Sequence, residues 1–456
     1  MFNKYRVLHF VGIGGVGMSG IAEVLHNLGY EVTGSDAKES ETTARLRKLG
    51  IRVFIGHHAG NIDSAHVVVI SSAVPSENPE TAEAKRLCIP VIRRAEMLAE
   101  LGRLKYGILV AGAHGKTTTT SLVATILGEG ELDPTVVIGG KLNAIGSNAK
   151  LGQGDYIVAE ADESDGSFLK LNPTIAVITN IDREHMEFFQ SMEVLKRAFL
   201  SFINKIPFYG IAVVCIENAY IRELLPGIER KVVTYGLSEQ ADIYARDITH
   251  DGTRMIFEPV FRGKSLGTFT VPIPGKHNVL NSLAAVAVAL ELQIPVETIR
   301  RALGGFSGIH RRFESKGEAR GVRVFDDYGH HPSEIQATLK AARECFPQGR
   351  LMVVFQPHRY TRTADLMDEF ASSFGDVDRL FLMDIYAAGE KPIEGVTAER
   401  LLQRMREKAG DKDIRYCPDR KELVDDMLAE LHEGDVVLTL GAGDVYRIGE
   451  EVVRSL

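Results

Sequence analysis

Short apolar runs of strand length alternate with helical patterns almost from one end of the chain to the other. A first series begins with Val7–Val11 and a helix near Ser19–Leu28. A second begins with residues 108–111, and a third begins near residues 322–325 and continues with Leu351–Phe355. This alternation is typical of parallel sheets whose strands are joined by helices. A length of 456 residues suits about three domains, at roughly 150 residues each. We therefore expect an α/β protein of three consecutive domains, each built on a mainly parallel sheet.

The domain boundaries are expected at the breaks between the three series. The first break follows a helical segment at 95–101, and the second follows a helix expected at 295–303 and the Gly304-Gly305 pair. The predicted domains are residues 1–105, 106–309 and 310–456.

A glycine-rich loop, Gly12-Ile-Gly-Gly-Val-Gly17, follows the first strand directly and begins a helix. Glycines allow the tight turn and let the backbone approach a diphosphate, and the helix N-terminus offers free N–H groups. Asp36 ends the next strand, about 20 residues further on, where an acid usually binds a ribose hydroxyl. The loop predicts a diphosphate-binding site, but it does not distinguish NAD from other ligands that contain a diphosphate. A tight turn that binds no ligand is the alternative.

A second glycine loop, Gly112-Ala-His-Gly-Lys-Thr117, again stands between a strand and a helix. Its Gly-Lys-Thr end is typical of sites that bind a nucleoside triphosphate. In such sites backbone amides surround the phosphate oxygens, a lysine (here Lys116) neutralises the β- and γ-phosphate charge, and the threonine hydroxyl binds Mg²⁺. The loop departs from the general P-loop, since Val110 stands where that pattern has its first glycine. Taken alone, it could be an ordinary helix start after a glycine turn.

Acidic and imidazole side chains follow two later strands, at 156–159 and 175–179. Because the carboxyl ends of parallel strands share one edge of a sheet, these groups are expected beside the second loop. Carboxylates suit Mg²⁺, and an imidazole is an acceptable partner. Either group alone could be a solvated loop, but together they favour a metal–nucleotide site. The side chains are Glu160, Asp162, Glu163, Asp165, Asp182 and His185.

The charge balance argues against a general affinity for nucleic acid or anionic lipid. There are 53 Lys and Arg residues against 61 Asp and Glu, a net charge of −8. No apolar run reaches the length of a membrane span, and the run near the start is too short for a signal peptide. We expect a soluble cytoplasmic protein.

Motifs along the whole chain resemble the Mur ligase family. Five of them, in order, are Gly112-Ala-His-Gly-Lys-Thr-Thr-Thr, Glu160-Ala-Asp-Glu-Ser-Asp, Thr179-Asn-Ile-Asp-Arg-Glu-His-Met, Gly275-Lys-His-Asn-Val-Leu-Asn and Arg311-Arg-Phe-Glu. Three others resemble the members that join L-alanine to UDP-N-acetylmuramate. These are Gly12-Ile-Gly-Gly-Val-Gly-Met-Ser-Gly, Asp326-Asp-Tyr-Gly-His-His-Pro and Gln356-Pro-His-Arg-Tyr-Thr-Arg-Thr.

The resemblance implies a Rossmann-like N-terminal domain for the UDP-sugar, a P-loop-like ATPase centre and a Rossmann-like C-terminal domain for the amino acid. It implies an ATP-dependent ligase that adds L-alanine to UDP-N-acetylmuramate through an acyl phosphate. ATP is then a substrate and Mg²⁺ the metal. The partners are these small molecules, with no nucleic acid or membrane, and the protein is a monomer or a homodimer.

The resemblance also assigns the two nucleotide sites. The UDP-sugar would be bound by Gly12, Gly14, Gly15, Val16, Gly17, Met18, Ser19, Ser35, Asp36 and Ser71. ATP would be bound by Gly112, Ala113, His114, Gly115, Lys116, Thr117, Thr118, His277, Asn278, Asn281 and Asp327. Asn278 and Asn281 share one helix face by their spacing, although Asn278 could instead cap that helix.

The same resemblance assigns the metal, catalytic and amino-acid-binding residues. The metal ligands would be Thr117, Glu160 and His185, and the catalytic residues Lys116, Glu160, His185 and Arg312. L-Alanine would be bound by Tyr328, His330, Arg359 and Arg362, since guanidinium groups suit a carboxylate.

Two positions depart from the family pattern. Ala113 stands where the family usually has Thr, and Glu184 stands where related enzymes tend to have Asp. Several sister ligases carry a carbamoylated lysine, but Lys196 is out of register and is not assigned.

Three other functions remain open at this point. One is a recycling ligase that joins a tripeptide to the same sugar. Another is an NAD-dependent oxidoreductase, suggested by the first glycine loop and opposed by the Gly-Lys-Thr loop. The last is a regulatory protein that binds ATP without forming an amide.

Overall fold

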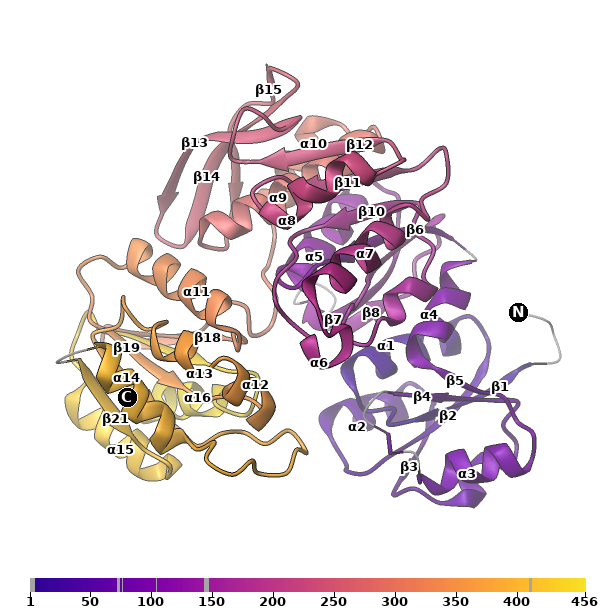
Figure 1. The fold of residues 1–456 in the computed structure, drawn as a ribbon, viewed down its shortest axis with the longest axis horizontal. Coiled ribbons are helices and arrows are strands. Elements are labelled where there is room, and N and C mark those ends of the chain that lie inside the picture. Colours follow the sequence, from indigo (N-terminus) through magenta and orange to yellow (C-terminus); the bar gives the residue numbers. More distant parts are fainter. Residues whose placement is uncertain (1–4, 72–73, 76, 104, 143–146, 410–411) are drawn as a thin grey trace. The chain divides into compact units, whose positions relative to one another are not determined.

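The computed structural model in Figure 1 describes residues 5–71, 74–75, 77–103, 105–142, 147–409 and 412–456. These residues form three sheets, so the expected α/β class is confirmed. The chain divides into two compact units. The first comprises Met1–Asp247, Phe257–Thr270 and Val279–Ser307, and the second comprises Ile248–Ile256, Val271–Asn278 and Gly308–Leu456. Among the described residues, no helix is long and apolar enough to cross a membrane.

The first sheet has five parallel strands in the order β3-β2-β1-β4-β5. Its central strand β1 is buried throughout, as expected of a strand paired on both sides in a parallel sheet. The chain leaves β1 on one side and returns on the other, so the first glycine loop lies where the strand order reverses. The elements are β1 (Val7–Val11), β2 (Glu31–Asp36), β3 (Arg52–Ile55), β4 (Val67–Ile70), β5 (Val91–Arg93), α1 (Val16–Asn27), α2 (Glu41–Lys48), α3 (Pro79–Arg86) and α4 (Arg94–Gly102).

The second sheet has eleven strands, and its central strands β10, β6 and β9 are parallel. The strand order reverses between β6 and β10, so the second glycine loop also lies at such a point. The antiparallel pairs β7·β8 and β14·β15 extend the two edges. The strands are β6 (Tyr106–Ala111), β7 (Thr135–Leu142), β8 (Ser147–Lys150), β9 (Tyr156–Glu160), β10 (Ile175–Ile178), β11 (Ile211–Cys215), β12 (Val232–Gly236), β13 (Ile243–Asp251), β14 (Arg254–Phe261), β15 (Lys264–Ser265) and β16 (Phe269–Val271).

Several helices are associated with this sheet, and some of them contribute side chains that surround the second glycine loop. They are α5 (Lys116–Glu129), α6 (Met186–Phe189), α7 (Met192–Ile203), α8 (Ala219–Leu224), α9 (Lys276–Glu291) and α10 (Val296–Gly304). Helix α5 begins at Lys116 because Gly115 before it adopts φ +79°, which a helix does not continue.

The third sheet has the order β17-β18-β22-β19-β20-β21, with β17 as its antiparallel edge. Alternate residues of β19 face two separate cores. Val353 and Phe355 pack toward α11, α13 and α14, whereas Met352 and Val354 pack toward α15 and α16. The elements are β17 (Glu314–Ala319), β18 (Val322–Asp327), β19 (Leu351–Phe355), β20 (Arg379–Leu382), β21 (Asp413–Tyr416), β22 (Val436–Leu440), α11 (Pro332–Cys345), α12 (Tyr360–Asp365), α13 (Met367–Ala371), α14 (Ala398–Ala409), α15 (Arg420–Glu430) and α16 (Tyr446–Ser455).

A buried carboxylate, Glu80, ties α3 to the end of β2. The Ser35 hydroxyl donates to Glu80 Oε2 at 2.5 Å, and Asn61 Nδ2 donates to Oε1 at 2.6 Å. His9 Nε2 lies 3.7 Å from the same carboxylate. Burial opposes the charged form, but His9, Ser35 and Asn61 outweigh it and lower the pKa of Glu80 from 4.5 to about 2.

We predict that Glu80→Gln lowers the stability of the first sheet by about 2–4 kcal/mol at pH 7, because a buried charge network is broken. A lowered pKa stabilises the fold above the ordinary value of 4.5, and this contribution is lost as pH falls toward 2. The gap in thermal midpoint between wild type and variant should therefore narrow below pH 4.5. Glu83→Gln, at an exposed pair on α3, is the control. A pH-independent gap would contradict the prediction.

Candidate functional site

The second glycine loop packs so closely against neighbouring strands that two of its glycines have no room for a side chain. A Cβ on Gly112 would lie 2.2 Å from Thr179 Oγ1 and 2.8 Å from the Asn180 carbonyl, and φ there is +136°. A Cβ on Gly115 would lie 2.6 Å from Asn281 Oδ1. Glycine at these two positions therefore lets the loop backbone pack directly against the end of β10 and the first turns of α9.

The loop is also held from the end of β10 by hydrogen bonds to His114. Its backbone N–H donates to Asn180 Oδ1 at 2.9 Å, and its carbonyl accepts from Thr179 Oγ1 at 2.6 Å and Asn180 Nδ2 at 3.0 Å. Its imidazole Nε2 lies 3.1 Å from Asp182 Oδ2. The Thr-Asn-Ile-Asp segment therefore fixes the shape of the loop.

Lys116 extends from the start of α5 to the acidic segment after β9. Its Nζ donates to both carboxylate oxygens of Glu163, at 3.0 and 2.9 Å, and to the Gly112 carbonyl at 2.5 Å. Burial works against the ammonium, but Glu163 and Asp162 outweigh it and raise the pKa of Lys116. Lys116 therefore carries a positive charge at neutral pH.

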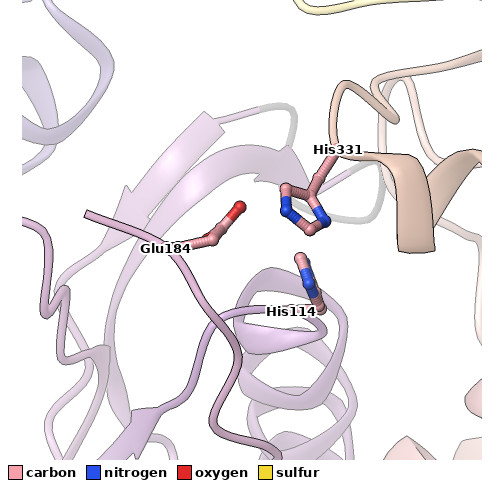
Figure 2. Close-up of side chains that lie close together, drawn as sticks. All are labelled: His114, Glu184 and His331. Atoms are coloured by element: carbon pink, nitrogen blue, oxygen red, sulfur yellow. The ribbon is translucent and has the colours of Figure 1, made fainter. Parts of the chain in front are cut away.

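A group of possible metal ligands lies beside this lysine. Glu163, Glu184 and His185 each offer a ligand atom, and the three atoms lie within 4.8 Å of one another. Two carboxylates and an imidazole suit a divalent cation. His185 adopts φ +56° at the start of α6, a conformation uncommon for a residue with a side chain. Figure 2 labels Glu184 and His114 of the first unit, together with His331 of the second.

The other two expected metal ligands have different surroundings. Glu160, at the end of β9, accepts from the Gly139 backbone N–H at 2.7 Å. Thr117 lies in the first turn of α5 and is 8% exposed. The group of three contains His185, one of the assigned ligands, together with Glu163 from the acidic run and Glu184, and it includes neither Thr117 nor Glu160.

The expected adenine-binding residues lie at the start of α9. Asn281 accepts from Thr119 Oγ1 at 3.2 Å and packs against Gly115, so it faces the second glycine loop. Asn278 donates from Nδ2 to the Pro274 carbonyl at 2.7 Å, a contact that anchors the start of the helix. Lys276 and His277 are exposed. Thr118 is buried on α5.

The first glycine loop is shaped by the end of β2. The Gly12 and Ile13 N–H groups donate to the Ser35 carbonyl at 2.8 and 2.9 Å, and Gly14 N–H donates to Asp36 Oδ2 at 2.8 Å. Ser71 approaches Gly12 from the end of β4. Asp36 thus holds the loop directly, whereas the Ser35 hydroxyl is used by Glu80.

Helix α1 continues from this loop and contacts the second sheet within the first unit. Asn148 Nδ2 donates to Ser19 Oγ at 3.2 Å. Gly15 is the N-cap of the helix and Met18 is buried. Val16 begins the helix, and its side chain lies outside the described part of the chain.

Arg94, which the sequence did not indicate, links the first glycine loop to the acidic segment after β9. A Cβ on Gly17 would lie 2.2 Å from Arg94 Nη1, so the guanidinium lies against the N-terminal turn of α1. Arg94 Nη2 also lies 3.5 Å from Asp162 Oδ2 in the acidic segment after β9. One cation therefore contacts both the diphosphate-type loop and the segment beside Lys116.

In the second unit, Asp327 is enclosed at the end of β18. It accepts from the backbone N–H groups of Phe313 and Gly329, both at 2.8 Å. Burial raises the pKa of its carboxyl to about 6, although Arg312 and these N–H groups favour the charged form. Arg312 stacks over the Tyr328 ring at 5.2 Å.

The expected amino-acid-binding residues follow two strands of the third sheet, β18 and β19, which β22 separates. Tyr328 and His330 come after β18, Arg359 is the N-cap of α12 after β19, and Arg362 lies in α12. The Tyr328 and His330 rings are 5.4 Å apart, and His330 lies 6.0 Å from His358. Arg362 Nη1 lies 3.3 Å from His358 Nδ1. Burial lowers the pKa of His330 to about 3 despite Glu334, so the ring is neutral at neutral pH.

Two further residues, His358 and Tyr386, complete this cluster of rings. Their rings stack at 5.6 Å with an angle of 9°. The Arg359 N–H donates to the Tyr386 carbonyl at 2.9 Å, and Arg359 adopts φ +71°. Strained backbone positions of this kind cluster at functional sites, although they also occur in turns. His358 stood in a quoted motif, but nothing in the sequence pattern pointed to Tyr386, about 25 residues beyond Arg362.

We predict that Gly112→Ala prevents nucleotide binding, because the added Cβ would overlap Thr179 and the β10 end. Gly128→Ala is the matched control, since a Cβ there meets nothing within 4 Å and the residue lies in α5. The control should bind normally and gain stability by up to about 1 kcal/mol. Calorimetric titration with ATP measures binding, and the thermal midpoint measures stability. Normal ATP binding by Gly112→Ala would contradict the prediction.

Comparison with known families matches three models in succession along the chain. Residues 7–106 match "Mur ligase family, catalytic domain", residues 110–289 match "Mur ligase middle domain", and residues 311–443 match "Mur ligase, glutamate ligase domain".

Curated relatives match over the full chain. A UDP-N-acetylmuramate–L-alanine ligase of Geobacter sp. (strain M21) is 57% identical over 456 residues, covering 100% of this chain and 99% of the relative. A protein of the same name from Desulfatibacillum aliphaticivorans is 55% identical, with 100% of both chains covered.

Solved structures agree with these matches. The UDP-N-acetylmuramate-alanine ligase of Thermotoga maritima superposes with a TM-score of 0.84 at 30% identity, covering 98% of each chain. A murein peptide ligase of Psychrobacter arcticus 273-4 has a TM-score of 0.73 at 23% identity, covering 99% of this chain and 98% of that one, and so shares the fold.

Proposed function

Because the chain belongs to the Mur ligase family, we propose that it joins L-alanine to UDP-N-acetylmuramate with conversion of ATP to ADP and phosphate. The observation that carries this proposal is the match over the whole chain, at 57% identity, to a relative named for that reaction. The two glycine loops agree with it, since one suits the diphosphate of a UDP-sugar and the other the phosphates of ATP.

A carboxylate does not react with an amine at neutral pH unless it first acquires a leaving group. In the proposed reaction the lactyl carboxylate of the sugar attacks the γ-phosphorus of ATP, and ADP leaves. The alanine amine then attacks the resulting acyl phosphate, loses a proton and displaces phosphate. The enzyme mainly positions three substrates and stabilises the charge on the transferred phosphoryl group.

In this proposal each predicted domain binds one of the three substrates. Residues 1–105 bind the UDP-sugar through the first glycine loop, residues 106–309 bind ATP, and residues 310–456 bind the amino acid. Lys116 balances the phosphate charge, and Arg312 reaches the γ-phosphate. His277, Asn278 and Asn281 receive the adenine.

Mg²⁺ is part of the proposal, and the chemistry of the donors beside Lys116 fits it. Thr117, Glu160 and His185 would hold the metal, with Glu163 and Glu184 close enough to His185 to join them. When bound, Mg²⁺ would neutralise charge on the phosphate oxygens.

Arg359 and Arg362 would bind the alanine carboxylate, beside Tyr328 and His330. We also propose a cytoplasmic location, since the reaction consumes ATP, and no membrane or nucleic-acid partner, since all the substrates are small molecules.

The deciding experiment measures phosphate release from ATP in the presence of UDP-N-acetylmuramate and one acceptor at a time. We expect L-alanine to stimulate release most, with glycine and L-serine weaker and the tripeptide of the recycling ligases inactive. Stimulation by the tripeptide alone would favour the recycling reaction. Release without stimulation by any acceptor would contradict the ligase proposal.

We predict that Lys116→Ala lowers kcat by at least about 10³-fold, since it removes the cation that faces the phosphates. UDP-N-acetylmuramate binding, measured by calorimetry, should be unchanged because the first glycine loop belongs to another sheet. Loss of UDP-sugar binding would count against the assignment of substrates to domains.

We predict that Arg362→Ala raises the KM for L-alanine about 10- to 100-fold, the effect of losing one charge-assisted hydrogen bond to a carboxylate. The KM values for ATP and UDP-N-acetylmuramate should not change. Arg454→Ala, at an exposed arginine of α16, is the control. An unchanged KM for L-alanine in Arg362→Ala would place the amino-acid carboxylate elsewhere.

A further inference from the structure

The ammonium of Lys116 is already satisfied by acceptors from the protein itself. An ammonium group has three N–H donors. Lys116 Nζ has four acceptors within 3.3 Å, namely both oxygens of Glu163 and the carbonyls of Gly112 and Ala113. The phosphates of a nucleotide therefore have to replace at least one of these acceptors before Lys116 can bind them.

Glu163 is the acceptor that can be replaced. The Gly112 and Ala113 carbonyls belong to the loop backbone, which hydrogen bonds from the β10 end hold in place. Glu163 is a side chain with rotatable bonds, and it is the only one of the three residues that carries a negative charge. Its carboxylate takes up a position on Lys116 that an anion would otherwise occupy.

A released Glu163 needs another cation, because its side chain is 3% exposed and a buried unpaired carboxylate is costly. Such a position exists nearby. A carboxylate oxygen of Glu163 already lies within 4.8 Å of ligand atoms of Glu184 and His185. A divalent cation held there would compensate the charge that Lys116 no longer balances.

We propose that Glu163 is an exchangeable counter-ion: it pairs with Lys116 when the site is empty, and it pairs with a divalent cation beside Glu184 and His185 when nucleotide phosphates occupy Lys116. This inference rests on the proposed function, since it assumes that ATP binds at Lys116. It makes Glu163 a positioning residue that couples nucleotide binding to metal binding.

The test measures ATP binding by calorimetry, with EDTA and with Mg²⁺, on the full chain without UDP-sugar or amino acid. In EDTA, Glu163→Gln should bind ATP about tenfold more tightly than wild type, because the competing ion pair is gone. The gain in affinity on adding Mg²⁺ should be smaller for Glu163→Gln than for wild type. A structural role alone would weaken binding under both conditions.

Glu193→Gln is the matched control. Glu193 also pairs with a lysine, Lys196 at 2.8 Å, but this ion pair lies on α7 and the Glu193 side chain is exposed. It should bind ATP as wild type does in both conditions. Glu163→Asp keeps the charge on a shorter side chain, and it serves as the second variant should Glu163→Gln not fold. Its ATP affinity in EDTA should lie above that of wild type.

Several results would overturn the proposal. One is that neither Glu163 variant binds ATP more tightly than wild type in EDTA. Another is that adding Mg²⁺ raises the ATP affinity of wild type and of Glu163→Gln by the same factor. Either result leaves the ligase reaction intact, since phosphate release with L-alanine is measured separately. If wild type binds no ATP, both proposals fail together.

Discussion

The close packing of the second glycine loop against the end of β10 is the constraint on which the rest of the central site depends. Gly112 lies so near Thr179 and the Asn180 carbonyl that no side chain fits between them. Hydrogen bonds from Thr179 and Asn180 then hold the His114 backbone. With the loop fixed, α5 begins at Lys116, and its ammonium is placed against the acidic segment after β9. Glu184 and His185, which we propose as metal ligands, follow the same strand end.

The same physical arrangement recurs in the first sheet with different chemistry. There the end of β2 shapes the loop through the Ser35 carbonyl and the Asp36 carboxylate. The buried Glu80 carboxylate in turn holds this strand end by accepting a hydrogen bond from the Ser35 hydroxyl. A net charge of −8 does not prevent either loop from receiving an anion. Helix N-termini, Lys116 and Arg94 supply positive potential where the phosphates would lie.

Much of the fold could be predicted because parallel strands buried on both faces are apolar throughout. Val7–Val11 and Leu351–Phe355 are examples, and the structure has both with the expected ends. Helix starts were less well predicted, since α1 begins at Val16 and the pattern placed it near Ser19. The antiparallel strands β14 and β15 were missed because they are short or partly exposed. Among site residues, Arg94 and Tyr386 were missed because their roles come from neighbours distant in sequence.

The sequence by itself determined the fold class, the family and both glycine loops, because these depend on local patterns: apolar runs, turn-forming glycines and motifs of a few residues. Only the tertiary structure decided which charges meet. The acidic run after β9 offers four carboxylates within six positions, and the sequence does not distinguish among them. Strand pairing and the direction of each side chain bring Glu163, with Glu184 and His185, to Lys116, and leave Glu160 beside Gly139. Electrostatic energy depends on distances in space, which the order of residues along the chain does not contain.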